Sequence, residues 1–477
     1  MECHIFGKMN WIKISLILCM FGFLKEFRPG EPFVTDYLTG YKNFTIVEVT
    51  EEIYPIGTYS YLATLVFMFL ITDLLCYKPI IILCGLSGIV TFTMLTFCQS
   101  LFAMKLVEFN YGLYLSTELA YYTYIYAKVD KEHYQKVSSY TRSAFLFGKF
   151  FAGTCSQGFV SFNLLNYHQL NYLTIGGQVF ATIVSFFLPS VKQSAYFNPK
   201  SITVEANFNL ENSSTQISFN KIDANDCNKT NDKPFIKKLQ RAYFLLWKDF
   251  LKAYTNLHVL KWSIWWAAAS CGYLQIVSYS QPVWQTAVED NQKIYNGAVE
   301  AIYSIIGAAT VFLIGLLKLN WSFLGEAFIA IFTFVEAFIL FVISNNFNIW
   351  ILYSLYIVFG VIYHTIITVA SFEIAKKISD DNYGLVFGVN ITMSLAMQSL
   401  LTYIVTSGRV FKLEIRKQFV VYSGYFVVLA VLFTVMAIFT ITRKIKRGED
   451  LNIWKTDSTK KVDVNDESVM HVPVDNC

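Results

Sequence analysis

The sequence predicts an all-α membrane protein whose twelve transmembrane helices form two six-helix halves. The first observation is the composition: of 477 residues, 55% are hydrophobic and only 15% are charged, against roughly 25% charged in a typical soluble domain. The second is that the apolar residues fall into twelve runs of about 20 residues, the length of helix that crosses a bilayer. The third is a single long polar stretch, residues 190–256, which divides the runs six and six.

The first part of the chain carries six of these runs. We predict spans at residues 11–28, 59–76, 79–98, 103–127, 139–162 and 170–189. The second part carries the other six, at residues 257–284, 297–317, 322–343, 347–373, 383–406 and 418–442. Residues 12–24 resemble a signal peptide, but no small-residue cleavage site follows, so we expect them to remain as part of the first span.

The domain boundaries follow from the runs. We predict an N-terminal six-helix half at 1–189, a cytoplasmic linker at 190–256, a C-terminal six-helix half at 257–442 and a cytoplasmic tail at 443–477. Two six-helix halves joined by a long loop are the architecture of the major facilitator superfamily. The linker begins with a stretch rich in Asn and Ser, which we expect to be disordered. At 234–254 it carries Lys among Phe, Leu and Trp, which favours an amphipathic helix on the cytoplasmic membrane surface, although a charged surface helix without a membrane role has the same pattern.

Basic residues indicate the orientation in the membrane. Most of them alternate onto one side, namely Lys78, Lys128, Lys131, Lys136, Lys318, Lys376 and Lys377, together with the linker and the tail. Because loops rich in Lys and Arg stay in the cytoplasm, we expect both termini to be cytoplasmic. The loop at 407–417 disagrees, since it carries four basic residues on the predicted outside. The sequon at Asn43 lies in the first outer loop, so we predict glycosylation there and a place in the plasma membrane, whereas the sequons at Asn212 and Asn228 should stay unmodified.

The composition also excludes several classes of function. A net charge of +4 gives no support for nucleic-acid binding, and nine cysteines and six histidines are dispersed without metal-ligand spacing. We therefore expect no metal and no cofactor. No nucleophile–base pair and no phosphate-binding loop is present, so we expect no catalytic residue and no enzyme. The partners that we expect are a small-molecule substrate and the lipid bilayer, with the chain acting as a monomer.

The segment Arg28-Pro29-Gly30-Glu31-Pro32-Phe33, at the end of the first apolar run, is unsuited to a simple membrane anchor. Each proline removes a backbone donor and blocks continuation of a helix. In lipid, irregular backbone is tolerated only where protein or a water-filled cavity covers it. An intramembrane carboxylate such as Glu31 is by default a functional-site candidate. The segment thus predicts a transporter or channel with a polar interior.

The fourth predicted span carries a polar stripe. Its members follow i, i+3, i+7, i+10 and i+14 spacing and share one helix face; they are Glu108, Tyr111, Leu115, Glu118 and Tyr122. We expect this face to line a wet cavity. Carboxylates beside aromatic rings suit an organic cation, through Coulomb attraction and cation–π contacts of ~0.5–2 kcal/mol each. Hydrogen bonding between helices is the alternative role for the same residues.

Other polar residues are candidates for gating and recognition. We predict that Asp73 forms an ion pair between helices that locks one conformation, with Arg142 as its partner, although both could be static structural groups. Asn296 offers a donor and an acceptor together, which suits a heteroaromatic ring, but Asn is also a common helix start. Asn390 and Gln398 are further polar points in the eleventh span, where packing is the simpler interpretation.

Many short motifs together resemble the reduced folate and thiamine carriers of animals, over roughly 11–190 and 257–442. In the N-terminal half the motifs are Arg28-Pro29-x-Glu31-Pro32-Phe33, Tyr59-Ser60-Tyr61-Leu62, Tyr77-Lys78-Pro79, Val107-Glu108-Phe109-x-Tyr111-Gly112 and Glu118-x-Ala120-Tyr121-Tyr122. In the C-terminal half they are Trp262-Ser263-x-Trp265-Trp266-Ala267, Tyr295-Asn296-Gly297-Ala298-Val299-Glu300-Ala301 and Leu385-Val386-Phe387-Gly388-Val389-Asn390. The resemblance implies a secondary active transporter that imports a vitamin by alternating access.

The family splits by the charge of its substrate, and the resemblance is to the thiamine branch. Folate is dianionic, and the folate branch places basic residues in spans four, ten and eleven, where this chain has Glu118, Gly360 and Gln398. An anion would also meet Glu108 and Glu118, at a cost of several kcal/mol. The resemblance therefore implies thiamine import, with proton antiport as a reasonable coupling.

The resemblance also implies a binding mode and three departures from it. Thiamine carriers hold the aminopyrimidine with residues matching Glu108, Tyr111 and Asn296. Near Gly57 and Phe92 these relatives carry tryptophans, and Lys149 stands where they have a tyrosine, from which it could pair with Glu108 or Glu118 or repel a cation. Pyridoxine, thiamine phosphate and reduced folate remain alternative substrates, and a non-transporting sensor is an alternative function. The expected substrate-binding residues are Glu31, Phe92, Glu108, Tyr111, Glu118, Tyr122, Lys149, Asn296 and Gln398.

Overall fold

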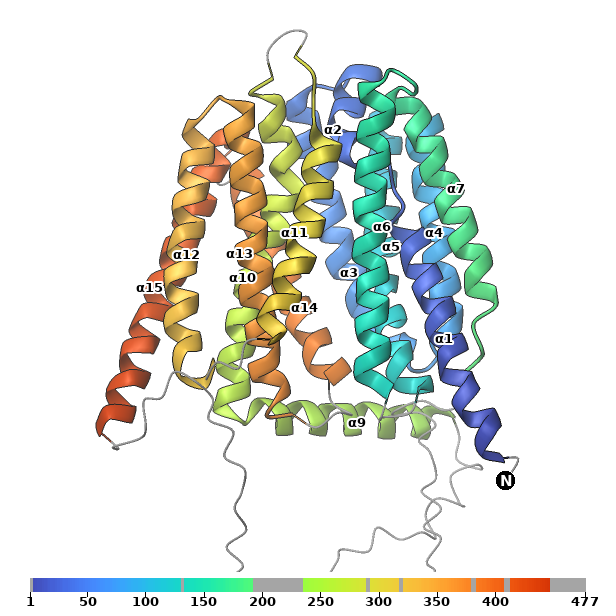
Figure 1. Cartoon of the computed structure of the whole chain (residues 1–477), viewed down its shortest axis with the longest axis vertical. Coiled ribbons are helices and arrows are strands. Elements are labelled where there is room, and N and C mark those ends of the chain that lie inside the picture. The colour runs from blue at the N-terminus through green and yellow to red at the C-terminus, as the bar shows by residue number, and fades with distance from the viewer. Residues whose placement is uncertain are drawn as a thin grey trace, which may run out of the picture.

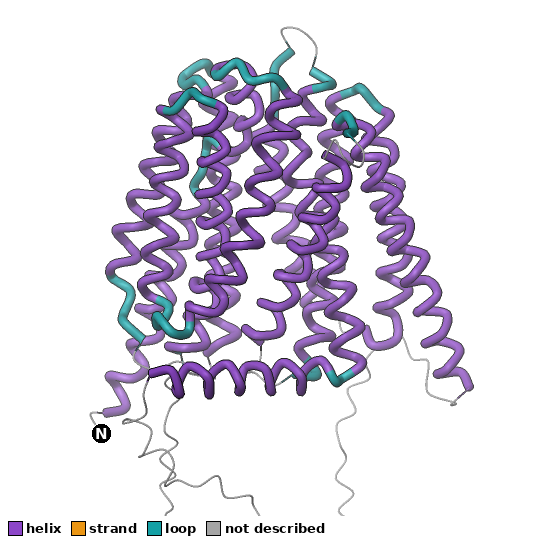
Figure 2. The backbone as a smooth tube through the Cα atoms, turned by 180° about the vertical axis from the view of Figure 1, so that it is seen from behind, coloured by secondary structure: helices purple, strands orange, loops and turns teal. Residues whose placement is uncertain are grey.

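The computed structural model describes residues 3–129, 133–191, 235–288, 292–316, 321–378, 383–406 and 412–446. The Asn- and Ser-rich part of the linker with the sequons at Asn212 and Asn228, and the tail beyond 446, lie outside these ranges. Within the described ranges the backbone consists of helices and short loops, without a strand (Figure 2). The predicted all-α fold is therefore confirmed.

Each predicted span overlaps one long helix. The N-terminal half contains α1 (Cys3–Glu26), α3 (Tyr54–Thr72), α4 (Lys78–Phe97), α5 (Leu101–Lys128), α6 (Tyr134–Ser161) and α7 (Tyr167–Phe186). The C-terminal half contains α10 (Leu257–Gln285), α11 (Asn296–Leu316), α12 (Trp321–Asn345), α13 (Ile349–Ala375), α14 (Tyr383–Thr406) and α15 (Ile415–Lys446).

Seven helices in the described part of the chain are long and apolar enough to cross a membrane. They are α3 together with the short helix η3 (Glu48–Ile53) before it, α4, and the helices from α11 to α15. The other five long helices carry more polar residues, and four of them (α1, α5, α6 and α10) contribute side chains to an internal cavity. Polar groups that face protein or water rather than lipid lower the hydropathy of a helix without preventing it from crossing. That these five also cross stays a prediction.

Several helix starts are encoded locally. At the start of α5, the Ser100 hydroxyl accepts a hydrogen bond from the Ala103 amide. At the start of α7, Asn166 and Gln169 form a capping box. Such side chains satisfy amides that the first turn leaves free, which stabilises a helix by about 0.5–2 kcal/mol.

The first span is a continuous helix as far as Glu26, and the chain then becomes irregular. α1 ends at Glu26, close to the predicted boundary, and the chain continues through three short elements: η1 (Glu31–Phe33), α2 (Val34–Asp36) and η2 (Tyr37–Tyr41). Pro32 lies in the first turn of η1, where its missing amide donor is tolerated. The Tyr37 hydroxyl donates to the Thr96 carbonyl near the end of α4. The proline segment therefore lies inside the bundle rather than at its surface.

The two halves lie side by side, the N-terminal half in blue to teal and the C-terminal half in yellow-green to red (Figure 1). They pack through α6 against α11 and through α3 against α14. Glycines permit the first of these contacts, since a Cβ at Gly153 would lie 2.6 Å from the Gly297 carbonyl oxygen. Small residues of this kind let membrane helices approach closely.

The bundle has two distinct ends. α9 (Phe235–Tyr254) runs across one of them (Figure 1, Figure 2); we call this the α9 end, and the opposite one, where α2 lies, the loop end. α1 begins and α15 ends at the α9 end (Figure 1). The helix predicted at 234–254 is thus confirmed. It reaches both halves, because Tyr243 donates to the Leu70 carbonyl of α3 (3.3 Å) and Tyr254 donates to Asn390 Oδ1 of α14 (2.8 Å).

Candidate functional site

A cavity of about 350 Å³ lies between the two halves, within the range of about 300–1,000 Å³ typical of small-molecule sites. Its charged wall residues are Glu26, Arg28, Glu31, Glu108, Glu118, Lys149 and Glu300. Its aromatic wall residues are Tyr54, Tyr61, Phe92, Tyr111, Phe145 and Tyr273. Of the residues predicted to bind substrate, those on the wall are Glu31, Phe92, Glu108, Tyr111, Glu118, Lys149 and Gln398.

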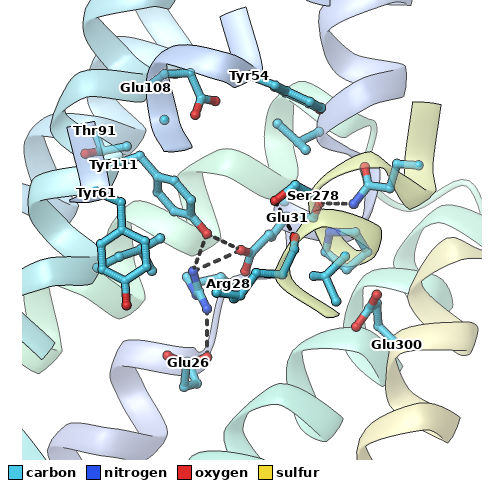
Figure 3. Close-up of a pocket in the computed structure, with 18 of the residues that line it drawn as sticks. Glu26, Arg28, Glu31, Tyr54, Tyr61, Thr91, Glu108, Tyr111, Ser278 and Glu300 are labelled. Carbon is cyan, nitrogen blue, oxygen red and sulfur yellow. Dashed lines mark hydrogen bonds and ion pairs between the residues drawn. The ribbon is translucent and has the colours of Figure 1, made fainter. Parts of the chain in front are cut away.

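Arg28 organises the centre of the cavity (Figure 3). Its Nη2 donates to Glu26 (2.7 Å) and its Nη1 donates to Glu31 (3.0 Å). The Tyr111 hydroxyl donates to the same Glu31 oxygen (2.7 Å). Arg28 is only 4% exposed, so its charge depends on these partners, and removing one would leave a buried charge uncompensated. The interruption after α1 is what lets Arg28 and Glu31 turn inward.

Two lysines neutralise further carboxylates. Lys25 is 1% exposed, and its Nζ lies 2.9 Å from Glu26 and 3.0 Å from Glu118. Lys149 Nζ lies 3.8 Å from Glu26. The expected pairing of Lys149 with Glu108 or Glu118 is therefore corrected: Lys25 already neutralises Glu118, and Lys149 turns toward Glu26.

Two wall carboxylates have no cation within ion-pair distance among the described residues. Glu108 lies against Gly57, where a Cβ would overlap its Oε2 atom. Glu300 accepts a hydrogen bond from the neutral Tyr356 hydroxyl (3.0 Å). Figure 3 places Glu108 and Glu300 on opposite sides of the Arg28 centre, one on each half of the molecule.

The charges of the cavity therefore do not cancel. The wall carboxylates are Glu26, Glu31, Glu108, Glu118 and Glu300, and the cations that form the wall or pair with it are Lys25, Arg28 and Lys149. Five negative groups against three positive groups leave an excess of two negative charges when all are ionised. Because uncompensated charge away from bulk water is costly, the cavity favours either protons or a cationic ligand.

Two of the predicted binding residues lie away from the cavity wall. Asn296 is buried, and its amide already donates to Asp36 Oδ2 (3.0 Å) and accepts from the Tyr353 hydroxyl (2.6 Å). Tyr122 faces Arg142, and its ring contacts the rings of Tyr121 and Phe145. The structure therefore gives both residues partners within the protein.

The predicted gating residues do not meet in this structure. The Tyr77 hydroxyl donates to Asp73 (2.8 Å) at the end of α3. Arg142 is exposed on α6 and faces Tyr122 and Glu118. The described contacts do not include an Asp73–Arg142 ion pair.

Hydrogen bonds join the two halves between the cavity and the loop end. Gln281 on α10 donates to the Glu31 carbonyl oxygen (2.9 Å) and accepts from the Thr35 amide (3.2 Å). The Asn296–Asp36 hydrogen bond links α11 to α2 in the same region. These contacts tie the two halves together toward the loop end.

Sequence reasoning missed three groups that the structure brings to the site, namely Lys25, Glu26 and Glu300. Lys25 and Glu26 end the first apolar run, where charges are ordinary, and Glu300 was noted only within a motif. The signal that could have found Glu300 is its place inside a predicted span, since an intramembrane carboxylate is costly unless it serves a site.

Comparison with known proteins decides the family. The model described as reduced folate carrier matches residues 9–421. The chain belongs to the reduced folate carrier family. Thiamine transporter 1 of Mus musculus is 39% identical to it, covering 92% of each chain, and thiamine transporter 2 of Homo sapiens is 37% identical, covering 93% of each. Folate transporter 1 of Caenorhabditis elegans is 34% identical, covering 89% of this chain and 92% of that protein.

Solved structures agree with the family in their fold. A POT family transporter in complex with 5-aminolevulinic acid matches with a TM-score of 0.61 at 12% identity, covering 89% of this chain and 96% of that one. The nucleoside transporter NupG matches with a TM-score of 0.54 at 14% identity, covering 89% and 98%. The predicted resemblance and the predicted major facilitator fold are confirmed, and the relatives are named transporters rather than enzymes.

One position bears on the two branches of the reduced folate carrier family. At Gly360 on α13, where we expected the folate branch to carry a basic residue, a Cβ would overlap the ring of Tyr303 on α11. A longer basic side chain could be accommodated only if Tyr303 moved. The packing of these two helices as it stands thus leaves no room for a basic side chain at this point.

Proposed function

We propose that this chain is a secondary active transporter that imports thiamine, an organic-cation vitamin, by alternating access. The observation that carries the proposal is the acidic cavity, which Glu108 and Glu300 face from opposite halves without an ion-pair partner among the described residues. A bound cation would offset part of the negative excess. The thiamine transporters among the relatives support the same substrate.

The roles of the wall residues follow from their chemistry. Glu108, Glu31 and Tyr111 hold the aminopyrimidine by hydrogen bonds, which suit its ring nitrogens and amino group. The aromatic wall, including Phe92, surrounds the thiazolium through cation–π contacts of ~0.5–2 kcal/mol each. Glu300 meets the cargo from the C-terminal half, so binding links the two halves. A ligand that contacts both halves can shift their equilibrium because it interacts differently with each conformation.

From the hydrogen bonds between the halves we infer that the loop end is closed in this conformation. We assign the loop end to the extracellular side, in line with the exposed Asn43, which follows α2 and η2 closely in the chain. We assign the α9 end to the cytoplasm, where both ends of the described chain lie (Figure 1). Asn296 and Asp36 then belong to the outer closure rather than to the binding site. The same orientation exposes Asn43 to glycosylation. We also propose that the chain works as a monomer in the plasma membrane.

Glu108→Gln tests the proposed site. A hydrogen bond to a charged group contributes about 1.5–3 kcal/mol, so removing the charge should weaken thiamine binding about tenfold to hundredfold. The measurement is the Kd of the purified protein for thiamine, together with uptake of labelled thiamine by cells that express it.

Glu414→Gln is the matched control, because this carboxylate is 81% exposed and pairs only loosely with Lys417 (3.6 Å). It should bind thiamine as the wild type does. Unchanged affinity of Glu108→Gln would exclude Glu108 from the site, and absence of saturable thiamine uptake by the wild type would exclude the substrate.

Thiamine phosphate is a second candidate cargo, favoured by Lys149. Its Nζ shares Glu26 with Lys25 and Arg28 and is the most distant of the three cations. It is therefore the wall cation best able to turn toward an anionic group. Stronger competition by thiamine phosphate than by thiamine in the uptake assay would favour this candidate, and we expect folate not to compete.

A further inference from the structure

A chain of three hydrogen-bonded side chains leads from the cavity wall into the C-terminal half. Tyr273 on α10 lines the cavity. Its hydroxyl lies 2.5 Å from the Tyr303 hydroxyl on α11, and that hydroxyl lies 2.6 Å from Nε2 of His364 on α13. The His364 imidazole is thus connected to the cavity through the hydroxyl groups of two tyrosines, on three different helices. The proposed binding mode does not use this imidazole.

The surroundings of His364 are aromatic and cationic. The titratable and charged groups that face it or its phenols are Tyr356 and Tyr363 on α13, Tyr273 on α10, Tyr303 and Glu300 on α11, Glu336 on α12 behind Tyr363, and Arg142 and Lys149 on α6. Tyr363 stacks on Tyr273 with ring centroids 3.8 Å apart, which fixes the ring that faces the cavity. No carboxylate lies within ion-pair distance of His364 among the described residues.

The three groups can pass a proton in either direction, because a phenol both donates and accepts. When the neutral ring carries its proton on Nδ1, a hydronium in the cavity gives a proton to the Tyr273 oxygen. Tyr273 passes its own proton to Tyr303, and Tyr303 passes its own to Nε2 of His364. Three bonds to hydrogen break and three form, both phenols stay neutral, and the imidazole gains one positive charge.

We propose that His364 is the proton-binding group that couples thiamine movement to proton movement, with Tyr303 and Tyr273 as its path to the cavity. The proposal rests on the proposed function and assigns its coupling site. Histidine is the side chain whose charge ordinarily changes near neutral pH. In this conformation burial and the cations Arg142 and Lys149 favour the neutral form of His364, the form that can accept a proton. A cationic cargo against Tyr273 and an imidazolium at His364 repel each other. Proton and cargo therefore oppose each other's binding, which an antiporter requires.

The test uses the full-length protein in proteoliposomes with an imposed pH gradient. If one proton exchanges for one cargo, a gradient of one pH unit drives about tenfold accumulation. The wild type should approach that ratio, whereas His364→Gln should reach only the equilibrium ratio of about one. Thiamine counterflow, the exchange of labelled for unlabelled cargo, needs no proton and should continue in this variant. Tyr303→Phe should behave in the same way, because it keeps the ring and removes both hydrogen bonds.

His168→Gln is the matched control. His168 also contacts two tyrosine hydroxyls, those of Tyr37 (3.0 Å) and Tyr172 (3.0 Å), but it lies at the start of α7 and not on the cavity wall. It should keep both gradient-driven accumulation and counterflow.

The outcomes separate this proposal from the function on which it rests. Accumulation by His364→Gln equal to that of the wild type would overturn the proposal. Loss of counterflow in that variant would also overturn it, because a structural role of His364 would then explain the loss of accumulation. Counterflow by the wild type without gradient-driven accumulation would refute the coupling alone. A wild type without counterflow would refute thiamine transport itself and the proposal with it.

Discussion

The position of Glu108 depends on the absence of a side chain at Gly57. The two residues face each other from neighbouring helices, α5 and α3, and a Cβ at Gly57 would overlap the Glu108 carboxylate. Relatives in the thiamine branch are expected to carry a tryptophan near this point, which would enclose the cargo. In this chain the Glu108 carboxylate takes that space instead. Under the proposed function, its electrostatic attraction for the cargo replaces part of an aromatic enclosure.

Gly57→Ala should therefore weaken thiamine binding. The new methyl group forces Glu108 to rotate, and overpacking of this kind costs about 1–3 kcal/mol, so the Kd for thiamine should rise about fivefold to hundredfold. Gly176→Ala is the control, because Gly176 is also helical and a Cβ there would meet no atom within 4 Å. Equal Kd values for the two variants would show that Gly57 does not set the position of the carboxylate.

At the scale of elements, α9 acts as a crossbar between the halves at the α9 end. Its outward side chains include Phe244, Trp247 and Leu251, all exposed, which is the pattern expected of a helix that lies on a membrane surface. Its inward contacts include the buried Ala253 and a polar contact, in which Tyr254 donates to Asn390. The side-chain nitrogen of Asn390 is buried without a hydrogen-bond partner in the described structure. The anchorage of α9 to α14 therefore depends strongly on one hydroxyl group.

Tyr254→Phe should lower the thermal stability of the protein. It leaves the Asn390 amide without its hydrogen-bond donor, and a buried unsatisfied polar group costs about 1–3 kcal/mol. The Tm, followed by tryptophan fluorescence in detergent, should fall by about 2 °C or more. Tyr140→Phe is the control, since Tyr140 is exposed on α6. A Tm shift as small as that of the control would mean that α9 is held by other contacts.

At the scale of the whole molecule, the polar contacts of Gln281 and Asn296 tie the two halves together toward the loop end. Gln281 binds the irregular segment after α1 through both a carbonyl oxygen and an amide. This segment also carries Glu31, a wall residue. These contacts and the cavity wall thus share one stretch of backbone, so separating the halves at the loop end must also move a residue of the wall.

Gln281→Ala should favour the conformation with an open loop end. It removes two hydrogen bonds between the halves, each worth about 0.5–1.5 kcal/mol net, so the open population should rise at least about fivefold. The readout is the rate at which an impermeant thiol reagent outside the cell labels Ser278→Cys, a cavity position, relative to the protein without that cysteine. Gln169→Ala, which changes a cap within one half, should leave the rate unchanged. A rate no faster than that of Gln169→Ala would place the closing contacts elsewhere.

The helices could be predicted from the sequence because a membrane helix satisfies its backbone internally, so run length alone locates it. The wall face of α5 could be predicted for a similar reason: the spacing of Glu108, Tyr111 and Glu118 fixes a common face whatever lies opposite. The prolines around Gly30 predicted that the helix is interrupted there. How deep the interrupted segment lies within the bundle depended on the contact of Tyr37 with the end of α4.

Only the tertiary structure decided which charges pair. Lys25 neutralises Glu118, Lys149 turns to Glu26, and Glu300 is left facing the cavity from the other half. Helix periodicity gives the direction of a side chain but not the helix that lies opposite, and the free energy of a buried charge depends on partners within a few Å. The sequence by itself thus determined a polar, acidic membrane interior, while the packing of α1, α6 and α11 determined which of its carboxylates remain for a cation.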